Sequence, residues 1–254
     1  MASFAELKKT ADAHFETARA ANEVTETTPT ALSDAVIEFA ATLTTEQPIM
    51  VPVVSDRFGL YGWCSDGVSE KVKVDGGSIV FGWTIWEVPK LLLTAEFHAV
   101  WSPADGSLVD ITPKPNAERQ IVFVPDGGYP QDFDFDLRPS NRRMRLYRPP
   151  VPDIQSLSGH MKPAQLVYEQ ARAKRAGIEL HEWLLSKRPR DPLVTALDEF
   201  IDLCGAHEAK QDSFEGNYFV PDAEYLSLSN RRAMAQRNVK RLSSKVLAAA
   251  NEPD

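Results

Sequence analysis

Cysteine is scarce in this sequence, because Cys64 and Cys204 are the two cysteines among 254 residues. Two thiols in a chain of this length do not make the disulfide framework of a small secreted domain. Cys204 follows helically spaced apolar residues at 196–201, a pattern typical of a core position, whereas Cys64 lies in the Gly-Trp-Cys-Ser-Asp segment 62–66. We therefore expect two free thiols in a reducing compartment, with Cys204 in the core.

Long apolar segments are also lacking. The sequence contains no apolar run of about 18 residues, the length that predicts a membrane span, and residues 1–16 lack the apolar core of a secretory signal. The formal charge of −8 disfavours a surface built as a whole for nucleic acid or for an anionic membrane. These absences, with an ordinary globular composition, predict a cytoplasmic protein that does not attach to a membrane.

The pattern of apolar and punctuating residues predicts an α+β fold in four segments. A helix is expected over 31–44, within an N-terminal helical segment 1–46. Short β-rich runs separated by Gly, Pro and Asp predict an antiparallel sheet in a catalytic core 47–125, at 49–54, 79–85, 91–101, 108–112 and 120–124. A Pro-rich connecting loop is expected over 126–161, and a C-terminal helical region over 162–254, with helices at 163–185, 192–205 and 222–250.

Cys64 is predicted to begin a short helix. Val68 and Val72 follow it at helical spacing, and Gly76-Gly77 supplies a glycine C-cap. At a helix N-terminus the unpaired N–H groups and the helix dipole favour thiolate over thiol. The same N–H groups can stabilise an oxyanion, so Cys64 is a candidate nucleophile.

A predicted hairpin places a histidine beside a carboxylate. His98 shares one strand face with Glu96 and Val100, and the loop 102–107 contains the Pro and Asp-Gly that are typical of a hairpin connection. If that hairpin is centred near Ala104, His98 lies opposite Asp110, at a Cβ separation of about 4.5–5.5 Å. The carboxylate would then orient the imidazole, whose other nitrogen can take the thiol proton.

These segments resemble the transglutaminase-like proteins of the wider papain-like superfamily, in which Cys at a helix start precedes His on a strand and then an Asp-Pro-Thr-like segment. Here they read Cys64, then His98-Ala99-Val100-Trp101, then Asp110-Ile111-Thr112-Pro113, within about residues 60–115. The resemblance implies a papain-like core in which Cys64 is the nucleophile, His98 the general base and acid, and Asp110 the orienting carboxylate. The blocks 82–87 and 96–101 also resemble a set of bacterial and phage proteins to which no substrate is assigned.

Several further residues are candidates for substrate binding around this predicted triad. They are aromatic or acidic and lie near the triad in sequence: Trp63, Trp83, Trp86, Glu96 and Trp101. Tryptophans in a small sheet also commonly fill the core, which is the alternative for each of them. Because Glu96 shares the face of His98, it is the main rival of Asp110 as the orienting acid.

Metal and nucleic-acid sites are not expected. Asp132, Asp134 and Asp136 alternate with Phe but lack the glycine and terminal glutamate of a calcium loop. Cys204 and His207 offer two ligands where structural zinc needs four. Basic residues are concentrated at 142–148 and 231–245, but the second run is interleaved with apolar residues, as in any amphipathic helix with a solvated face.

The sequence thus predicts a cysteine-dependent hydrolase, such as a thiol protease or amidase, or a transglutaminase-like acyl transferase. Its substrate would be a peptide or protein amide, isopeptide or ester, cleaved through a thioester without a cofactor. The alternative is a non-catalytic binding or inhibitory module of the same fold that engages a protein or nucleic-acid partner. In either case the C-terminal helices are a candidate surface for a protein partner.

Overall fold

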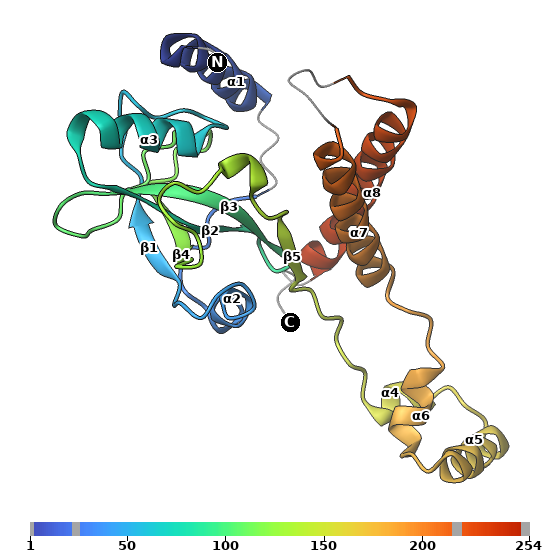
Figure 1. The fold of residues 1–254 in the computed structure, drawn as a ribbon. Helices are drawn as coiled ribbons and strands as arrows, with labels where there is room; N and C mark the ends of the chain where they lie inside the picture. The colour runs from blue at the N-terminus through green and yellow to red at the C-terminus, as the bar shows by residue number, and fades with distance from the viewer. Residues whose placement is uncertain (1–2, 22–25, 215–219, 250–254) are drawn as a thin grey trace. The chain divides into compact units, whose positions relative to one another are not determined.

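The computed structural model of the chain describes residues 3–21, 26–214 and 220–249 (Figure 1). The chain forms two compact units, each made from two separate stretches of sequence. The first unit comprises Met1–Leu146 and Ile201–Arg232, and the second comprises Tyr147–Phe200 and Ala233–Asp254. All the predicted site residues belong to the first unit.

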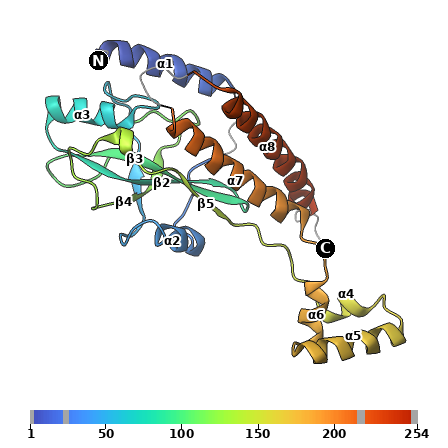
Figure 2. The same ribbon diagram turned by 45° about the vertical axis from the view of Figure 1, so that its right-hand side comes forward.

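The first unit is built on an open antiparallel sheet of five strands in the order β1-β4-β2-β3-β5 (Figures 1 and 2). The strands are β1 (Ile49–Pro52), β2 (Ser78–Val88), β3 (Leu92–Ser102), β4 (Gln120–Pro125) and β5 (Arg142–Arg145). β2 and β3 are rich in β-branched and aromatic residues, which favour the extended backbone, and they pair over their full length. The α+β class and the antiparallel sheet predicted from the sequence are confirmed.

The strand alternation divides the apolar residues into two cores. The larger core contains the odd-numbered side chains of β2 and β3, from Ile79 to Ile85 and from Leu93 to Ala99, packed with apolar residues of neighbouring helices. The smaller core contains Val100 with residues of β1 and β4. His98 therefore projects to the side of the smaller core, because successive residues of a strand point to opposite faces.

The segment predicted as a strand at 108–112 contains no regular strand. Val109 forms an isolated antiparallel bridge to Trp101, and Asp110 forms an isolated parallel bridge to Val53. The bridge to Trp101 sets Asp110 opposite Val100, so the predicted register of His98 opposite Asp110 is wrong by two residues. The segment instead joins β3 to the chain that leaves β1, because residues 109 and 110 bridge different partners.

Two helices of the first unit contribute buried apolar residues to the larger core: α2 (Asp34–Ala40) and α3 (Cys64–Asp75), of which α3 contacts both β2 and β3 (Figure 2). The helix α1 (Phe4–Ala21) packs aromatic rings against the segment 58–63 that precedes α3. Ser33 caps α2 by accepting a hydrogen bond from the N–H of Val36, as expected for a helix near 31–44. α3 begins at Cys64 and ends at Gly76, whose φ of 77° suits glycine, so the predicted helix start and C-cap are confirmed.

The predicted Pro-rich connecting loop, 126–161, is wrong in part. It contains the short 3₁₀ helix η1 (Phe135–Leu137), the edge strand β5 and the helix α4 (Ile154–Ser158). β5 reads Arg-Arg-Met-Arg and carries no apolar alternation, which is why the sequence pattern did not reveal it. Its pairing with residues 92–95 of β3 depends on backbone hydrogen bonds, which any residue type except proline can donate and accept.

The C-terminal region is helical, as predicted. It contains α5 (Pro163–Ala176), α6 (Leu180–Ser186), α7 (Pro192–Asp212) and α8 (Ala223–Ala249). The single helix expected over 163–185 is divided into α5 and α6, because Gly177 adopts the left-handed conformation with φ 72° and ends α5. Ala250, the last residue of the predicted third helix, lies outside the described residues. No helix in the described part of the chain has both the length and the apolar character needed to cross a bilayer.

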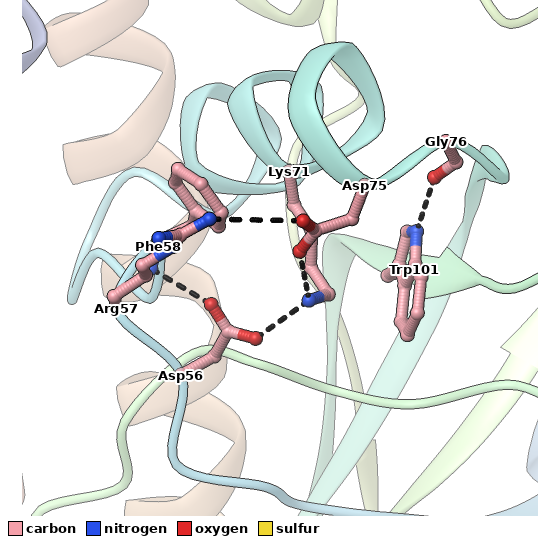
Figure 3. Close-up of polar contacts among 7 residues, drawn as sticks. All are labelled: Asp56, Arg57, Phe58, Lys71, Asp75, Gly76 and Trp101. Carbon is pink, nitrogen blue, oxygen red and sulfur yellow. Dashed lines mark hydrogen bonds and ion pairs between the residues drawn. The ribbon is translucent and has the colours of Figure 1, made fainter.

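A buried lysine anchors α3 to the loop that precedes it (Figure 3). Lys71 Nζ lies 2.7 Å from Asp56 Oδ2 and 2.9 Å from Asp75 Oδ2, and it also lies 4.2 Å from the centroid of the Trp101 ring. Trp101 in turn donates a hydrogen bond of 3.0 Å to the carbonyl of Gly76 at the end of α3. The cluster joins the loop, the helix and β3, so it determines how α3 lies on the sheet.

We expect the substitution Lys71→Met to destabilise the first unit by about 2 kcal/mol, because it leaves Asp56 without its cation, removes one of the two cations that pair with Asp75 and removes the contact with the Trp101 ring. Chemical denaturation followed by tryptophan fluorescence measures this. The matched control is Lys73→Met, since the Lys73 side chain is 70% exposed on the same helix and its pair with Glu70 contributes little. An equal effect of the two substitutions would contradict the anchoring role of Lys71.

Candidate active site

Asp110 is held in place by backbone hydrogen bonds on both sides. Its N–H donates to the carbonyl of Pro52 at 2.9 Å, and its own carbonyl accepts from the N–H of Val54 at 2.9 Å. The residue has no exposed surface. Asp110 is therefore fixed to the end of β1 whichever way its side chain turns.

The Asp110 carboxylate contacts two cationic side chains and one backbone N–H. Oδ1 accepts a hydrogen bond of 2.8 Å from the N–H of Thr112 and lies 3.2 Å from His98 Nε2. Oδ2 lies 2.7 Å from Lys114 Nζ. Both cation contacts are ion pairs whose directions depart from ideal hydrogen-bond geometry, so the attraction is chiefly Coulombic. The contact predicted between His98 and Asp110 is thus present, although their predicted register is wrong.

The backbones of β2 and β4 approach each other closely beside His98. Gly82 of β2 is the cross-strand partner of His98. A Cβ at Gly82 would lie 2.2 Å from the carbonyl oxygen of Val124, so a larger residue does not fit. Glycine thus lets β4 pack tightly against β2 at the level of His98.

The buried charges determine the protonation state of His98. Burial by itself lowers the pKa of His98, but the Asp110 carboxylate outweighs it and, with a smaller contribution from the field of Cys64, raises the pKa to about 10. Burial raises the pKa of Asp110, whereas His98 and Lys114 lower it more strongly, and the net shift is downward. At neutral pH Asp110 is therefore ionised and His98 is protonated, and both lie in the same cluster as the amino group of Lys114.

The orientation of the imidazole leaves one nitrogen for chemistry. Because Asp110 faces Nε2, Nδ1 is the ring atom through which His98 can exchange a proton with another group. A carboxylate on one nitrogen and a reacting group on the other is the arrangement by which an acid orients a catalytic histidine.

Cys64 is the first residue of α3. The turn before it contains Gly62 with a φ of 85°, a conformation that favours glycine. Trp63 occupies the N-cap position but provides no side-chain hydrogen bond, so it leaves the first N–H groups of α3 without a cap. Cys64 is 8% exposed and packs at the margin of the larger core.

A cavity of about 740 Å³ is bordered by two of the three predicted catalytic residues. Cys64 and His98 both border it, as do Thr112 and Lys114 beside Asp110. Phe97 borders it too, so the cavity extends around the edge of β3 and meets both of its faces. Within the described part of the chain, β5 pairs with this edge as far as Ala95 and the next bridge is at Trp101, so the cavity lies at a break in the pairing.

The predicted substrate-binding residues fall into two groups. Trp63, Trp86 and Glu96 border the cavity, and Trp86 Nε1 donates a hydrogen bond of 3.0 Å to Glu96 Oε2. Glu96 is thereby engaged with Trp86, and Asp110 is the carboxylate that contacts His98.

Trp83 and Trp101 are not among the described residues that border the cavity. Trp83 is 4% exposed in the larger core and donates to Asp126 Oδ2 at 3.2 Å, while Trp101 contacts the end of α3. The alternative of a packing role fits the contacts of these two tryptophans, and their substrate-binding role stays a prediction. Both belong to the odd-numbered set of their strands, which is the set that packs in the larger core.

Lys114 is the main residue of the cluster that the sequence analysis missed. Its side chain is 5% exposed, and its Nζ lies 5.5 Å from the centroid of the Trp86 ring. The available signal was a lysine between Pro113 and Pro115, four residues after the predicted catalytic aspartate. A charge flanked by two prolines is held on a stiff segment, which suits a fixed ion pair.

The structure also shows where Cys204 and the acidic segment near 134 lie. Cys204 is a free, buried thiol whose pKa is raised by burial, as expected of a core cysteine. Asp134 accepts a hydrogen bond from the N–H of Asp136 at the start of η1. In the described ranges, no three histidine, cysteine or acidic side chains are grouped as a metal ion requires.

No protein-family model, no curated protein and no solved structure matches the chain.

We expect the His98 ring to stay protonated well above neutral pH, and Asp110→Asn to lower its pKa below the ordinary 6.5, since an amide no longer offsets burial and the nearby Lys114. Ring ¹⁵N chemical shifts measured across the pH range report this. Asp105→Asn, at an exposed position in the loop 102–107, is the control for the same change of charge. Ordinary titration of His98 near 6.5 in the unmodified protein would contradict the buried ion pair.

The same ion pair makes stability depend on pH. A histidine whose pKa is raised on folding stabilises the protein fully below its unfolded value of 6.5, and this contribution is lost as the pH rises through about 10. The difference in unfolding free energy between the unmodified protein and Asp110→Asn should therefore shrink over that interval. A difference in unfolding free energy that does not change with pH would show that Asp110 stabilises the protein by a means other than the ionisation of His98.

Proposed function

We propose that the protein is a cysteine-dependent hydrolase or acyl transferase in which Cys64, His98 and Asp110 form the catalytic triad. The observation that carries the proposal is the buried His98–Asp110 pair, at 3.2 Å, on a cavity that Cys64 also borders from a helix N-terminus. A nucleophile, a proton carrier and an orienting carboxylate are the three parts that acyl transfer through a thioester requires.

Positive charge close to Cys64 supports its role as the nucleophile. Two cations, His98 and Lys114, share the single carboxylate of Asp110, which leaves one buried positive charge without a partner. A Cys64 thiolate would neutralise it, and the uncapped N–H groups of α3 would stabilise the same negative charge.

The reaction then follows from this protonation state. The Cys64 sulfur attacks the carbonyl carbon of an amide, and the N–H groups at the start of α3 stabilise the oxyanion that forms. His98 donates its Nδ1 proton to the departing nitrogen, the carbon–nitrogen bond breaks and a thioester remains. Water or a second amine next attacks the thioester and gives its proton to His98, which restores the thiolate and the imidazolium.

The transglutaminase-like, papain-like core expected from the sequence belongs to this proposal. Its support is the order of the elements: Cys64 begins a helix, His98 lies on a strand of the antiparallel sheet, and Asp110 lies on the next bridged segment. A protein partner for the C-terminal helices, α5 to α8, stays a prediction.

The test is the rate at which each thiol reacts with iodoacetamide. At pH 7 we expect Cys64 to be alkylated at least about tenfold faster than Cys204, because thiolate is the reacting form and burial raises the pKa of Cys204. His98→Asn should remove most of this difference, while His160→Asn, in the other unit, should leave it unchanged. Peptide mapping by mass spectrometry after timed quenching gives both rates.

Slow alkylation of both cysteines in the folded protein would overturn the catalytic proposal. The second candidate function, a binding module of the same fold, would then be favoured by the position of Cys64, which is 8% exposed and packs against the larger core. Such a module would use the same cavity to hold a partner without forming a covalent bond.

A further inference from the structure

Charged side chains around the cavity differ in how far they are neutralised. Five acidic and four basic side chains border it: Glu26, Asp66, Glu96, Glu118 and Asp136, with His98, Lys114, Arg138 and Arg143. The sign of the charge that a ligand meets depends on which of these already have partners.

Each basic side chain is engaged. Lys114 pairs with Asp110 at 2.7 Å. Arg143 binds Glu208 with two nitrogens, at 3.0 and 2.5 Å. Arg138 donates to the carbonyl of Phe135 and lies over the ring of the same residue, so it keeps its charge. His98 shares Asp110 with Lys114, and the thiolate proposed for Cys64 balances the second of these two cations. In the described lining, Arg138 is therefore the basic side chain that no acidic side chain neutralises.

The acidic side chains are less neutralised. In the described ranges, Asp66, Glu96, Glu118 and Asp136 form no ion pair with a basic residue, although Glu96 accepts from Trp86 and Glu118 accepts from Asn116. Asp66 lies in the first turn of α3, two residues after Cys64, and its pKa is raised first by burial and then by the neighbouring Asp136. The second contribution is the one that a carboxylate close by produces.

Aromatic rings lie among these carboxylates. Tyr61, Trp63, Trp86 and Phe135 border the same cavity. The faces of aromatic rings attract cations, and the attraction adds to that of carboxylates when both surround one site. Rings and carboxylates together are a combination that suits an ammonium or guanidinium group.

A buried polar group indicates that a ligand also makes hydrogen bonds here. Thr112 is 5% exposed and borders the cavity, and its hydroxyl has no hydrogen-bond partner in the described part of the chain. Buried hydroxyls are rarely left unpaired, so a polar group of a bound molecule is a suitable partner.

We propose that the substrate carries a cationic ammonium or guanidinium group close to the bond that Cys64 attacks, held by Asp66 and Asp136 among the aromatic rings. This inference deepens the proposed function and depends on it, since it assigns the substrate class of the same site. The Thr112 hydroxyl hydrogen-bonds a neutral polar group of that substrate.

The test uses the charge of the thiol reagent in place of an unidentified substrate. Three methanethiosulfonates are compared: trimethylammonioethyl, methyl and sulfonatoethyl. Each reacts alike, because the Cys64 sulfur attacks the reagent sulfur, a mixed disulfide forms and methanesulfinate leaves. Cys204→Ala leaves Cys64 as the single thiol, and rates are normalised to those of 2-mercaptoethanol at the same pH and ionic strength.

We expect the cationic reagent to react about tenfold faster than the anionic one, a preference that falls as salt is added. Asp66→Asn and Asp136→Asn should each reduce the ratio about threefold, as removal of one nearby charge does. The control is Glu70→Gln, which removes the same charge from α3 at a residue that does not border the cavity and is paired with Lys73.

The outcomes separate the two proposals. Fast reaction without a preference for the cation overturns the inference and leaves the catalytic proposal intact. Slow reaction with all three reagents overturns the catalytic proposal, and the inference is then judged by tryptophan fluorescence. Cation binding is supported if tetramethylammonium changes the fluorescence in a saturable way and acetate does not. The change should also be lost in the variant with both Asp66→Asn and Asp136→Asn. The lack of a saturable fluorescence change with tetramethylammonium overturns the inference.

Discussion

The Asp110 carboxylate has no contact with solvent, so it is stabilised only by the groups around it: the cations of His98 and Lys114 and the N–H of Thr112. Removing one partner of such a cluster leaves a buried charge uncompensated, which costs far more than an exposed pair contributes. Because Asp110 is also bonded through its backbone to Pro52 and Val54, the position of the imidazole is tied to the end of β1.

The helix start at Cys64, the strand with His98 and the glycine cap at Gly76 were predictable, since each has a local signal: residue spacing, alternation or a cap. The contact of His98 with Asp110 was predicted from a register that is wrong. It is present because both residues lie on the same face of β3 and its bridged neighbour, where a diagonal neighbour is still within reach. Side-chain alternation therefore proved more robust than the hairpin geometry.

Other parts of the site had no local signal. β5 consists almost entirely of arginine and is a strand only because β3 offers it backbone partners. Lys114 is buried because Asp110 is buried, and a sequence pattern that assigns lysine to the surface does not show this. The separation of Trp86, on the cavity, from Trp83, in the larger core, does have a local signal, because side chains alternate between the two faces along β2.

Three different elements carry the proposed triad, and they are attached to the fold in different ways. Asp110 and His98 contact each other directly, whereas Cys64 is held by α3. α3 is joined to the preceding loop at Lys71, two turns after Cys64 on the same helix face, by the ion pair with Asp56, while Asp75 pairs with Lys71 from within the helix. A rotation of α3 at that point would change the position of Cys64 relative to His98. The relation of Cys64 to the imidazole thus depends on a salt bridge that takes no part in the proposed chemistry.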